Sequence, residues 1–498
     1  MANKKPASVE TVNRLISDMH LTLVSSYKEL IADLRMAEVL KRNDLHGLDA
    51  AEKEYIGNVL SVHANVCYCN LCLCAQMRAS LKAKLDVEKQ FTIRRGVGTL
   101  HEMYKYLFGF TPKKTLWQEV EDVLRSKYPV ECQAVDDAAT SFLQQYAQVE
   151  DGTLRDVTKH FSDDPTEFFQ NMKNVTERSV TERVAAGSAF LLPLHQMLVK
   201  ELREYFGTSY DLAITFPMPE QNIDISGVNQ EKIEAIGQGL VKYSGIVNHL
   251  MLQLDRVQEL CKKFNLDVMQ NQHWKDFTQN NIGLHILYIY IDSMSTFRAF
   301  VGSESFAEIR QNLAYFILSA HEGFKKLYGF DENKRDLTYW NRAIKTAIMQ
   351  NGDDEAKKKA VKLEMRLDDL SQNALLKNED MIVAFTHVGT IKKRGNVSAF
   401  LVLDYFRQPI NRDEMNQLTE FLGVMNDIVA LYNQVMDLEN RQIQQETDNM
   451  FAGYFDQLDG WEEKMKEKAQ GNLEAIAKCE ELMNLMRNGL NDIKKKFS

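Results

Sequence analysis

One short string of charged side chains carries the residue types that chemistry on a phosphate requires. Arg155, Asp156 and His160 lie close together in the sequence, and Lys159 stands directly before the histidine. A histidine side chain can take up and release protons near neutral pH, because its unperturbed pKa is about 6.5. Arginine stays charged and can bind two phosphate oxygens through its planar guanidinium group. The string therefore fits proton transfer beside a bound phosphate.

This string resembles the signature of the HEPN superfamily, and more specifically that of its abortive-infection and toxin-type members. Their motif is an arginine, then asparagine, aspartate or histidine, then a few residues and a histidine, a pattern that Arg155, Asp156 and His160 match. The resemblance implies an all-helical fold with tandem or dimeric units. It also implies a metal-independent endoribonuclease that acts in bacterial phage defence or as a toxin.

In such an enzyme the 2′-hydroxyl of RNA attacks the neighbouring phosphate and leaves a 2′,3′-cyclic phosphate and a 5′-hydroxyl. The resemblance assigns acid–base catalysis to His160, binding of the phosphate to Arg155 and orientation of one of them to Asp156. Lys159 is a candidate for substrate binding. This chemistry requires no cofactor and no metal ion, and we predict neither.

The spacing of the motif sets a geometric condition on the site. Five positions along a regular helix separate two side chains by about 140°, so Arg155 and His160 cannot converge on an unbroken helix. Either the helix is interrupted between them or two facing units share the site. HEPN proteins typically use such a shared cleft.

The charge of the chain limits how it could contact RNA. The formal net charge is −10, whereas proteins that bind long nucleic acid through its phosphates usually carry a positive balance. We therefore expect a local RNA contact and no DNA binding. The 498 residues are 44% hydrophobic and 26% charged, which is typical of folded globular domains.

The sequence also favours a particular cell compartment. The residues after Met1 are polar and lack an apolar signal core, and we find no run of eighteen or more apolar residues. The seven cysteines are odd in number and unevenly placed, as expected for reduced thiols. We therefore predict a cytoplasmic protein with no membrane contact.

A long internal repeat is the strongest organisational signal. Residues 101–110 (HEMYKYLFGF) recur as residues 321–330 (HEGFKKLYGF), an offset of 220. The same offset relates identical residues elsewhere: Leu30 and Leu250, Leu34 and Leu254, Tyr68 and Tyr288, Arg78 and Arg298, Ala79 and Ala299. After residue 351 extra residues raise the offset to 232, which matches Asp136 with Asp368 and Thr158 with Thr390. The repeat predicts a duplicated unit.

Helical periodicity and few prolines predict an all-α protein of two tandem antiparallel helical-bundle units from an internal duplication, with a C-terminal helical extension. We predict a first, HEPN-like unit over 1–207, a linker with a β-prone run at 212–216 over 208–230, a second, degenerate unit over 231–440, and the extension over 441–498. The apolar stripe of the extension predicts a helix that closes the core of the second unit.

The second unit lacks the complete motif. By the offset of 232, Arg155 is matched with His387 and His160 with Lys392. Lys392 and Arg394 keep a positive charge and are candidates for phosphate binding, but they cannot supply the same acid–base pair. If the units face each other, the chain holds one complete motif, and a symmetric site would need a homodimer formed through the first units.

Two other patterns suggest metal sites only at first sight. Cys67 and Cys74 share one side of a helix, while Cys69 and Cys72 lie roughly opposite, so the four thiols cannot surround one ion. His101 begins a zinc-protease-like string, but a lysine occupies the second ligand position. We expect residues 101–110 to brace a helix that ends at Gly109, and residues 321–330 one that ends at Gly329.

Two other functions remain open. A non-catalytic helical binding or scaffold protein would explain the acidic charge and the lost second motif. A small-molecule sensor with a pocket between the units is the third hypothesis. The lysine run at 357–359 fits a solvated helix face, with a contact to RNA or to a regulatory protein partner as the alternative.

Overall fold

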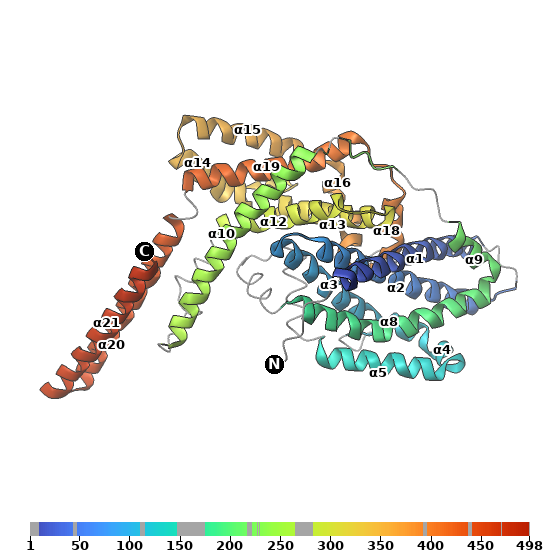
Figure 1. Ribbon diagram of the computed structural model, residues 1–498, viewed down its shortest axis with the longest axis horizontal. Coiled ribbons are helices and arrows are strands. Elements are labelled where there is room, and N and C mark those ends of the chain that lie inside the picture. Colours follow the sequence, from blue (N-terminus) through green and yellow to red (C-terminus); the bar gives the residue numbers. More distant parts are fainter. Residues whose placement is uncertain are drawn as a thin grey trace.

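The chain forms an almost entirely helical structure, which confirms the predicted all-α class (Figure 1). The computed structural model describes residues 9–42, 47–109, 115–146, 175–216, 222–226, 228, 230–263, 282–391, 396–436, 441–469 and 471–497. Strands β1 (Thr390–Ile391) and β2 (Asn396–Val397) form one short antiparallel pair, in which Thr390 faces Val397.

The first unit is built around long helices that pack side by side. Helix α1 runs antiparallel along α2, and α2 in turn packs against α3 and α8. The described elements of this unit are α1 (Val9–Lys41), α2 (Ala50–Lys82), α3 (Asp86–Leu107), η1 (Trp117–Glu119), α4 (Glu121–Lys127), α5 (Pro129–Gln145), α8 (Glu177–Phe206) and α9 (Thr208–Thr215).

The second unit repeats this order. Helix α12 packs against α10, α13 and α19, as α2 packs against α1, α3 and α8. Its described elements are α10 (Gln230–Lys263), α12 (Ile282–Val301), α13 (Phe306–Leu327), η3 (Glu332–Leu337), the π-helical turn η4 (Trp340–Ile344), α14 (Lys345–Asn351), α15 (Asp354–Ser371), α16 (Ala374–Lys377), α17 (Glu379–Thr386), β1, β2, α18 (Ser398–Phe406) and α19 (Arg412–Met436).

Helices α2 and α3 of the first unit face α12 and α13 of the second, and the contacts between them are reciprocal. Arg78 pairs with Glu308 at 3.1 Å, and Arg298 pairs with Glu88. Both arginines and both glutamates are related by the offset of 220. Two copies of one surface that meet about a two-fold axis make contacts of this kind, so the pairs support the predicted duplication.

The repeated ten-residue segments end α3 and α13 in the same way. Gly109 and Gly329 have φ values of 75° and 78°, in the left-handed region that favours glycine. Their amides donate to the carbonyls of Tyr104 (3.2 Å) and Phe324 (2.9 Å), five residues earlier, so each helix closes with a hydrogen bond from its glycine. The expectation that these glycines end the helices is confirmed.

Helix α2 is the core helix of the first unit. Among the described helices it alone is long and apolar enough to cross a membrane by length and composition, and 78% of that apolar window is buried inside the protein. Its N-terminus carries a capping box, in which Asp49 accepts from the Glu52 amide and Glu52 accepts from the Asp49 amide. Burial on all sides explains why its hydrophobic residues do not form a narrow stripe.

The predicted linker differs from expectation at its start. The run at 212–216 was expected to be β-prone, but Thr208–Thr215 form helix α9, which packs against α1 and α8. Tyr210 and Ala213 are buried there. Tertiary burial of one side of this segment therefore outweighs its local β propensity.

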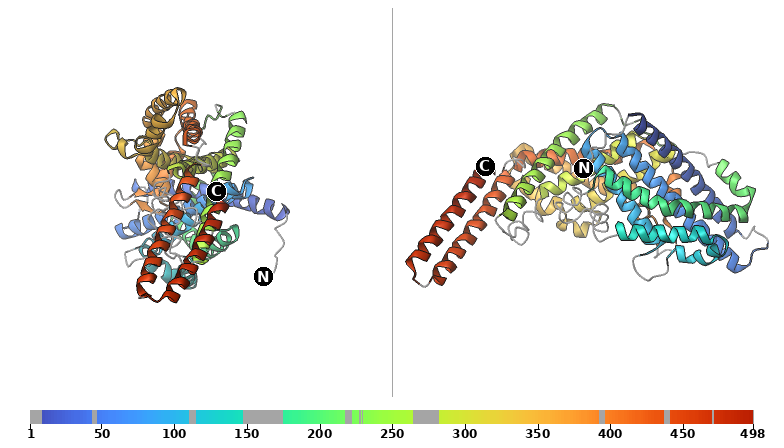
Figure 2. Two further views of the ribbon diagram at one scale, coloured as in Figure 1. Left: turned by 90° about the vertical axis from the view of Figure 1, so that its left-hand side faces the viewer. Right: turned by 60° about the horizontal axis from the view of Figure 1, so that its bottom comes forward.

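The C-terminal extension does not close the core of the second unit, contrary to the expectation from its apolar stripe. Helices α20 (Arg441–Lys468) and α21 (Leu473–Phe497) pack on each other and project from the body as a hairpin (Figures 1 and 2). Cys479, Met483 and Leu490 of α21 are buried. The apolar stripe of α21 therefore packs within the hairpin, although Leu485 remains 65% exposed.

Candidate functional site

The predicted catalytic residues lie outside the described part of the structure. This holds for Arg155, Asp156, Lys159 and His160, and also for the second-unit candidates Lys392 and Arg394. The repeat matches Arg155 with His387, which lies in the described part of the second unit.

His387, the residue matched with Arg155, lies where the two units meet. Its Nδ1 is 3.1 Å from Oε2 of Glu102 on α3 of the first unit, and its ring meets that of Tyr106 edge-on at 6.4 Å. Gly389 packs so closely on the Tyr106 ring that a Cβ there would lie 2.0 Å from a ring carbon. The segment after α17 is thus fitted to the first unit.

The matched segment of the second unit is not one continuous helix. Helix α17 ends at Thr386, the strands β1 and β2 follow, and α18 begins at Ser398. The hydroxyl of Ser398 donates to the carbonyl of Gly389, which ties the two sides of the interruption together. In this unit, a helix break therefore occurs at the place matched with the motif, which corresponds to one of the two arrangements that the motif spacing allows.

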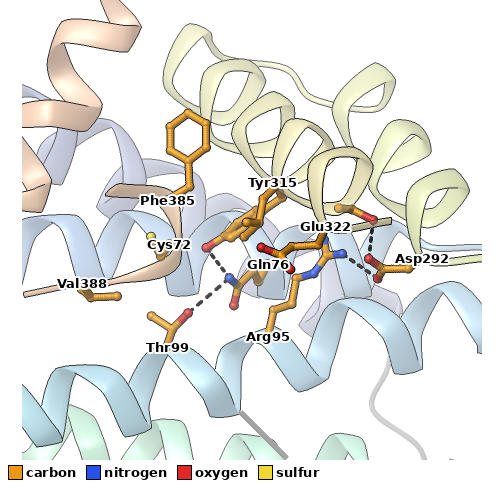
Figure 3. A pocket seen from close by; sticks show the side chains of 11 residues that line it. Cys72, Gln76, Arg95, Thr99, Asp292, Tyr315, Glu322, Phe385 and Val388 are labelled. Carbon is orange, nitrogen blue, oxygen red and sulfur yellow. Dashed lines mark hydrogen bonds and ion pairs between the residues drawn. The ribbon is translucent and has the colours of Figure 1, made fainter. Parts of the chain in front are cut away.

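Behind this segment, a polar network fills the junction of the units (Figure 3). Gln76 donates to the hydroxyls of Thr99 (3.3 Å) and Tyr315, and Arg95 donates to Asp292 at 2.7 Å. These residues come from α2 and α3 on one side and from α12 and α13 on the other. The network therefore fixes the two units against each other.

Asp292 is the charge centre of this junction. It accepts hydrogen bonds from Arg94, Arg95 and Ser319, and its own side chain is only 2% exposed. The guanidinium of Arg94 also lies over the ring of Phe91 at 4.1 Å. Burial lowers the pKa of Arg94, while Tyr288 and Asp292 oppose that shift. The arrangement holds two arginines on one carboxylate away from bulk water.

The cavity enclosed by the network has a volume of about 20 Å³, enough for a water molecule and too small for a ligand. A larger cavity of about 250 Å³ between the units is lined by Lys82, Glu88, Arg298 and Glu308, which are engaged in ion pairs. The largest of these three, about 500 Å³, lies between α10, α12 and α19 within the second unit. A small-molecule sensor with a pocket between the units would therefore use the cavity of about 250 Å³ and not the small junction cavity.

A second polar cluster lies inside the first unit, where α1, α2 and α8 meet. It consists of Glu29 from α1, His63 and Cys67 from α2, and His195 from α8. His63 and Cys67 are four residues apart and so share one face of α2. The donor atoms of the four side chains all lie within 4.8 Å of one another.

Hydrogen bonds orient the members of this cluster. Nε2 of His195 is 2.6 Å from Oε2 of Glu29, and Sγ of Cys67 is 3.6 Å from the same oxygen. Nδ1 of His63 donates to Asp33 at 2.8 Å, and the Tyr210 hydroxyl donates to the same carboxylate at 2.9 Å. Sγ of Cys67 lies beside the His63 ring, 3.6 Å from Nε2 and 3.8 Å from Nδ1.

The protonation of the cluster reflects its burial and its charges. Burial disfavours the charged form of Glu29, but the hydrogen bond and charge of His195 outweigh it and lower the pKa of this carboxyl. Burial likewise disfavours protonated His63, and the charge of Asp33 outweighs it and raises the pKa of the imidazole. Burial raises the pKa of the Cys67 thiol well above its usual value. Without a ligand, burial and the neighbouring charges therefore favour an ionised Glu29 beside a protonated His63 and a protonated Cys67.

This cluster was not predicted, because only the cysteines of α2 form a visible pattern in the sequence. The structure separates them as the helical wheel predicts: Cys67 faces α1 and α8, while Cys72 lies in the junction beside Tyr315. The one local signal was the spacing of His63 and Cys67, which places two possible ligands on one helix face. Glu29 and His195 come from distant parts of the chain and left no pattern.

Comparison with known proteins gave no relative: no family model, no curated protein and no solved structure matches the chain.

Proposed function

We propose that the chain is a metal-independent endoribonuclease of the HEPN type, acting in bacterial phage defence or in a toxin system. The observation that carries the proposal is the motif of Arg155, Asp156 and His160 in an all-helical chain. His160 would transfer the protons, Arg155 would stabilise the charge on the phosphate, and Asp156 would orient one of them. Lys159, with Lys392 and Arg394 from the second unit, would bind the substrate.

Two features of the second unit support this proposal. His387, matched with Arg155, lies against Glu102 at the junction of the units, as expected if the motif segments line a shared cleft. The helix is also broken between α17 and α18. A break of the same kind in the first unit would remove the 140° separation that a regular helix would impose on Arg155 and His160.

The test is cleavage of a mixed pool of cellular RNA and transfer RNA by the full chain, with EDTA present only during the reaction. His160→Ala and Arg155→Ala, purified in the same way, control for contaminating nucleases. We expect cyclic-phosphate ends from the wild type and a loss of about 100-fold or more in each variant. Cleavage that persists in both variants, or none by the wild type with infected-cell extract added, would contradict the proposal.

The alternative function is a non-catalytic binding or scaffold protein. The projecting hairpin of α20 and α21 favours it, because Trp461, Leu482 and Leu485 leave between 40% and 65% of their side chains exposed. Apolar side chains on a projecting element are typical of a surface that binds another protein. Deletion of residues 441–498 separates the two functions, since a scaffold loses its partner while a nuclease keeps a folded motif.

A further inference from the structure

The cluster of Glu29, His63, Cys67 and His195 offers the donor set of a metal site. Two imidazole nitrogens, one thiolate sulfur and one carboxylate oxygen are all ligands that Zn²⁺ accepts in proteins. The mixture includes a soft sulfur, which disfavours Mg²⁺ and Ca²⁺. Three helices contribute to it, so an ion there would join α1, α2 and α8.

The spacing of the donors suits a tetrahedral ion. Zinc–ligand distances of about 2.0–2.3 Å place neighbouring ligand atoms roughly 3.3–3.6 Å apart in a tetrahedron. Sγ of Cys67 lies 3.6 Å from both His63 Nε2 and Glu29 Oε2, and these two atoms are 4.0 Å apart. To hold the ion, the hydrogen bond of 2.6 Å between His195 and Glu29 has to lengthen, and the separation of 4.0 Å between Glu29 and His63 has to shorten.

The residues around the donors prepare them for a metal. Asp33 accepts the proton on Nδ1 of His63, which leaves Nε2 as the atom that faces the cluster. Metal-binding histidines usually have such a carboxylate behind them. Tyr210 donates to the other oxygen of Asp33 and so fixes the carboxylate in turn. A buried carboxylate and a buried tyrosine thus orient one imidazole.

The cluster is also accessible from one side. His63 is fully buried, but the side chains of Glu29 and His195 are 14% and 24% exposed. An ion can therefore enter past His195, while the far side is closed by protein. Four protein ligands leave no position for a reactive water, as in structural zinc sites.

We propose that the first unit binds one Zn²⁺ through Glu29, His63, Cys67 and His195, and that this ion joins α1, α2 and α8. The site departs from the sequence-based expectation of no metal. It is separate from the proposed nuclease chemistry, because the ion acts on the fold and takes no part in proton transfer. The second unit has Gly283 and Leu287 at the positions of His63 and Cys67, so the matched place there cannot form this site.

A second group of possible ligands, His20, Glu304 and Glu308, is a weaker candidate. Its two carboxylates already pair with Arg78 and Lys82, at distances of 2.7 to 3.5 Å. A cation there would have to compete with two fixed positive charges. This group provides a control for the test.

The test uses the full chain, purified without chelators, its metal content measured by mass spectrometry. The metal-free protein is then titrated with Co²⁺, because tetrahedral cobalt with a thiolate ligand has strong visible bands and a thiolate charge-transfer band in the near ultraviolet. We expect one zinc per chain as purified and both sets of cobalt bands. Cys67→Ser should lose the charge-transfer band, and His195→Gln should bind at least tenfold more weakly.

Two matched variants control for indirect effects. Cys69→Ser changes another buried cysteine of α2, and His20→Ala changes the alternative group; both should bind cobalt as the wild type does. His195 is partly exposed, so His195→Gln tests the site even if Cys67→Ser fails to fold, with circular dichroism as the check. Absence of zinc and cobalt binding, or cobalt bands that disappear only in His20→Ala, would overturn the proposal.

Discussion

The two units differ far more in their reactive side chains than in the helices that hold them. Both have a long central helix, α2 or α12, packed against matched neighbours, and both end the next helix with a left-handed glycine. Yet only the first unit carries the complete Arg155–His160 motif and the cluster around His63. The shared residues thus maintain the interface and the caps, while the reactive side chains are concentrated in one unit.

At the junction, positions matched by the repeat carry different side chains and make different contacts. Asp292 occupies the position matched with Cys72, and Tyr315 the position matched with Arg95. Arg95 donates to Asp292, whereas Tyr315 lies beside Cys72 with weaker polar contact. One of two symmetry-related pairs has therefore become an ion pair, which makes the interface between the units asymmetric in strength.

The largest stability effect should come from Asp292→Ala. It leaves the buried guanidiniums of Arg94 and Arg95 without a carboxylate, which should lower the free energy of unfolding by about 3–5 kcal/mol. Cys72→Ala, at the matched position, should cost on the order of 1 kcal/mol. Urea unfolding followed by circular dichroism measures both. Equal costs would mean that the junction is not asymmetric.

A smaller difference is expected between the two reciprocal ion pairs. Arg78 and Glu308 are each 1% exposed, whereas Arg298 and Glu88 are 23% and 6% exposed. Arg78→Met should therefore cost about 3 kcal/mol and Arg298→Met about 1–2 kcal/mol, because water compensates the more exposed pair. The same unfolding measurement applies. A larger cost for Arg298→Met would reverse the order that burial predicts.

The smallest effect concerns the support of the zinc site. Asp33→Asn keeps the size of the side chain but removes the charge that holds Nδ1 of His63, and should weaken cobalt binding by about 10- to 100-fold. Asp211→Asn, an exposed change on α9, should leave binding unchanged. Cobalt titration measures the affinity of the two variants. An unchanged affinity in Asp33→Asn would show that His63 needs no such orientation.

Much of the framework could be predicted from sequence because it depends on local signals. Helical periodicity, the offset of 220, and glycines that end two matched helices all lie within short windows of the chain. The exposed lysines at 358 and 359 on α15, with Ala356 and Ala360 buried beneath them, also follow from a helical wheel.

The remaining features depend on tertiary contacts that no short window contains. The cluster around His63 needs three helices to meet, and Glu29 and His195 carry no spacing that points to it. The apolar stripe of α21 was correctly read as a packing face, but its partner is α20 and not the second unit. A stripe indicates that a face is covered and does not say by what.

The proposed chemistry belongs to the first unit, and matched substitutions in the two units test this claim most directly. His160→Ala in the first unit and His387→Ala in the second are compared for the rate of RNA cleavage by the full chain. We expect His160→Ala to reduce the rate by about 100-fold or more. His387→Ala, which removes the contacts with Glu102 and Tyr106, should keep most of the activity. Equal losses in both variants, or full activity in His160→Ala, would contradict the claim.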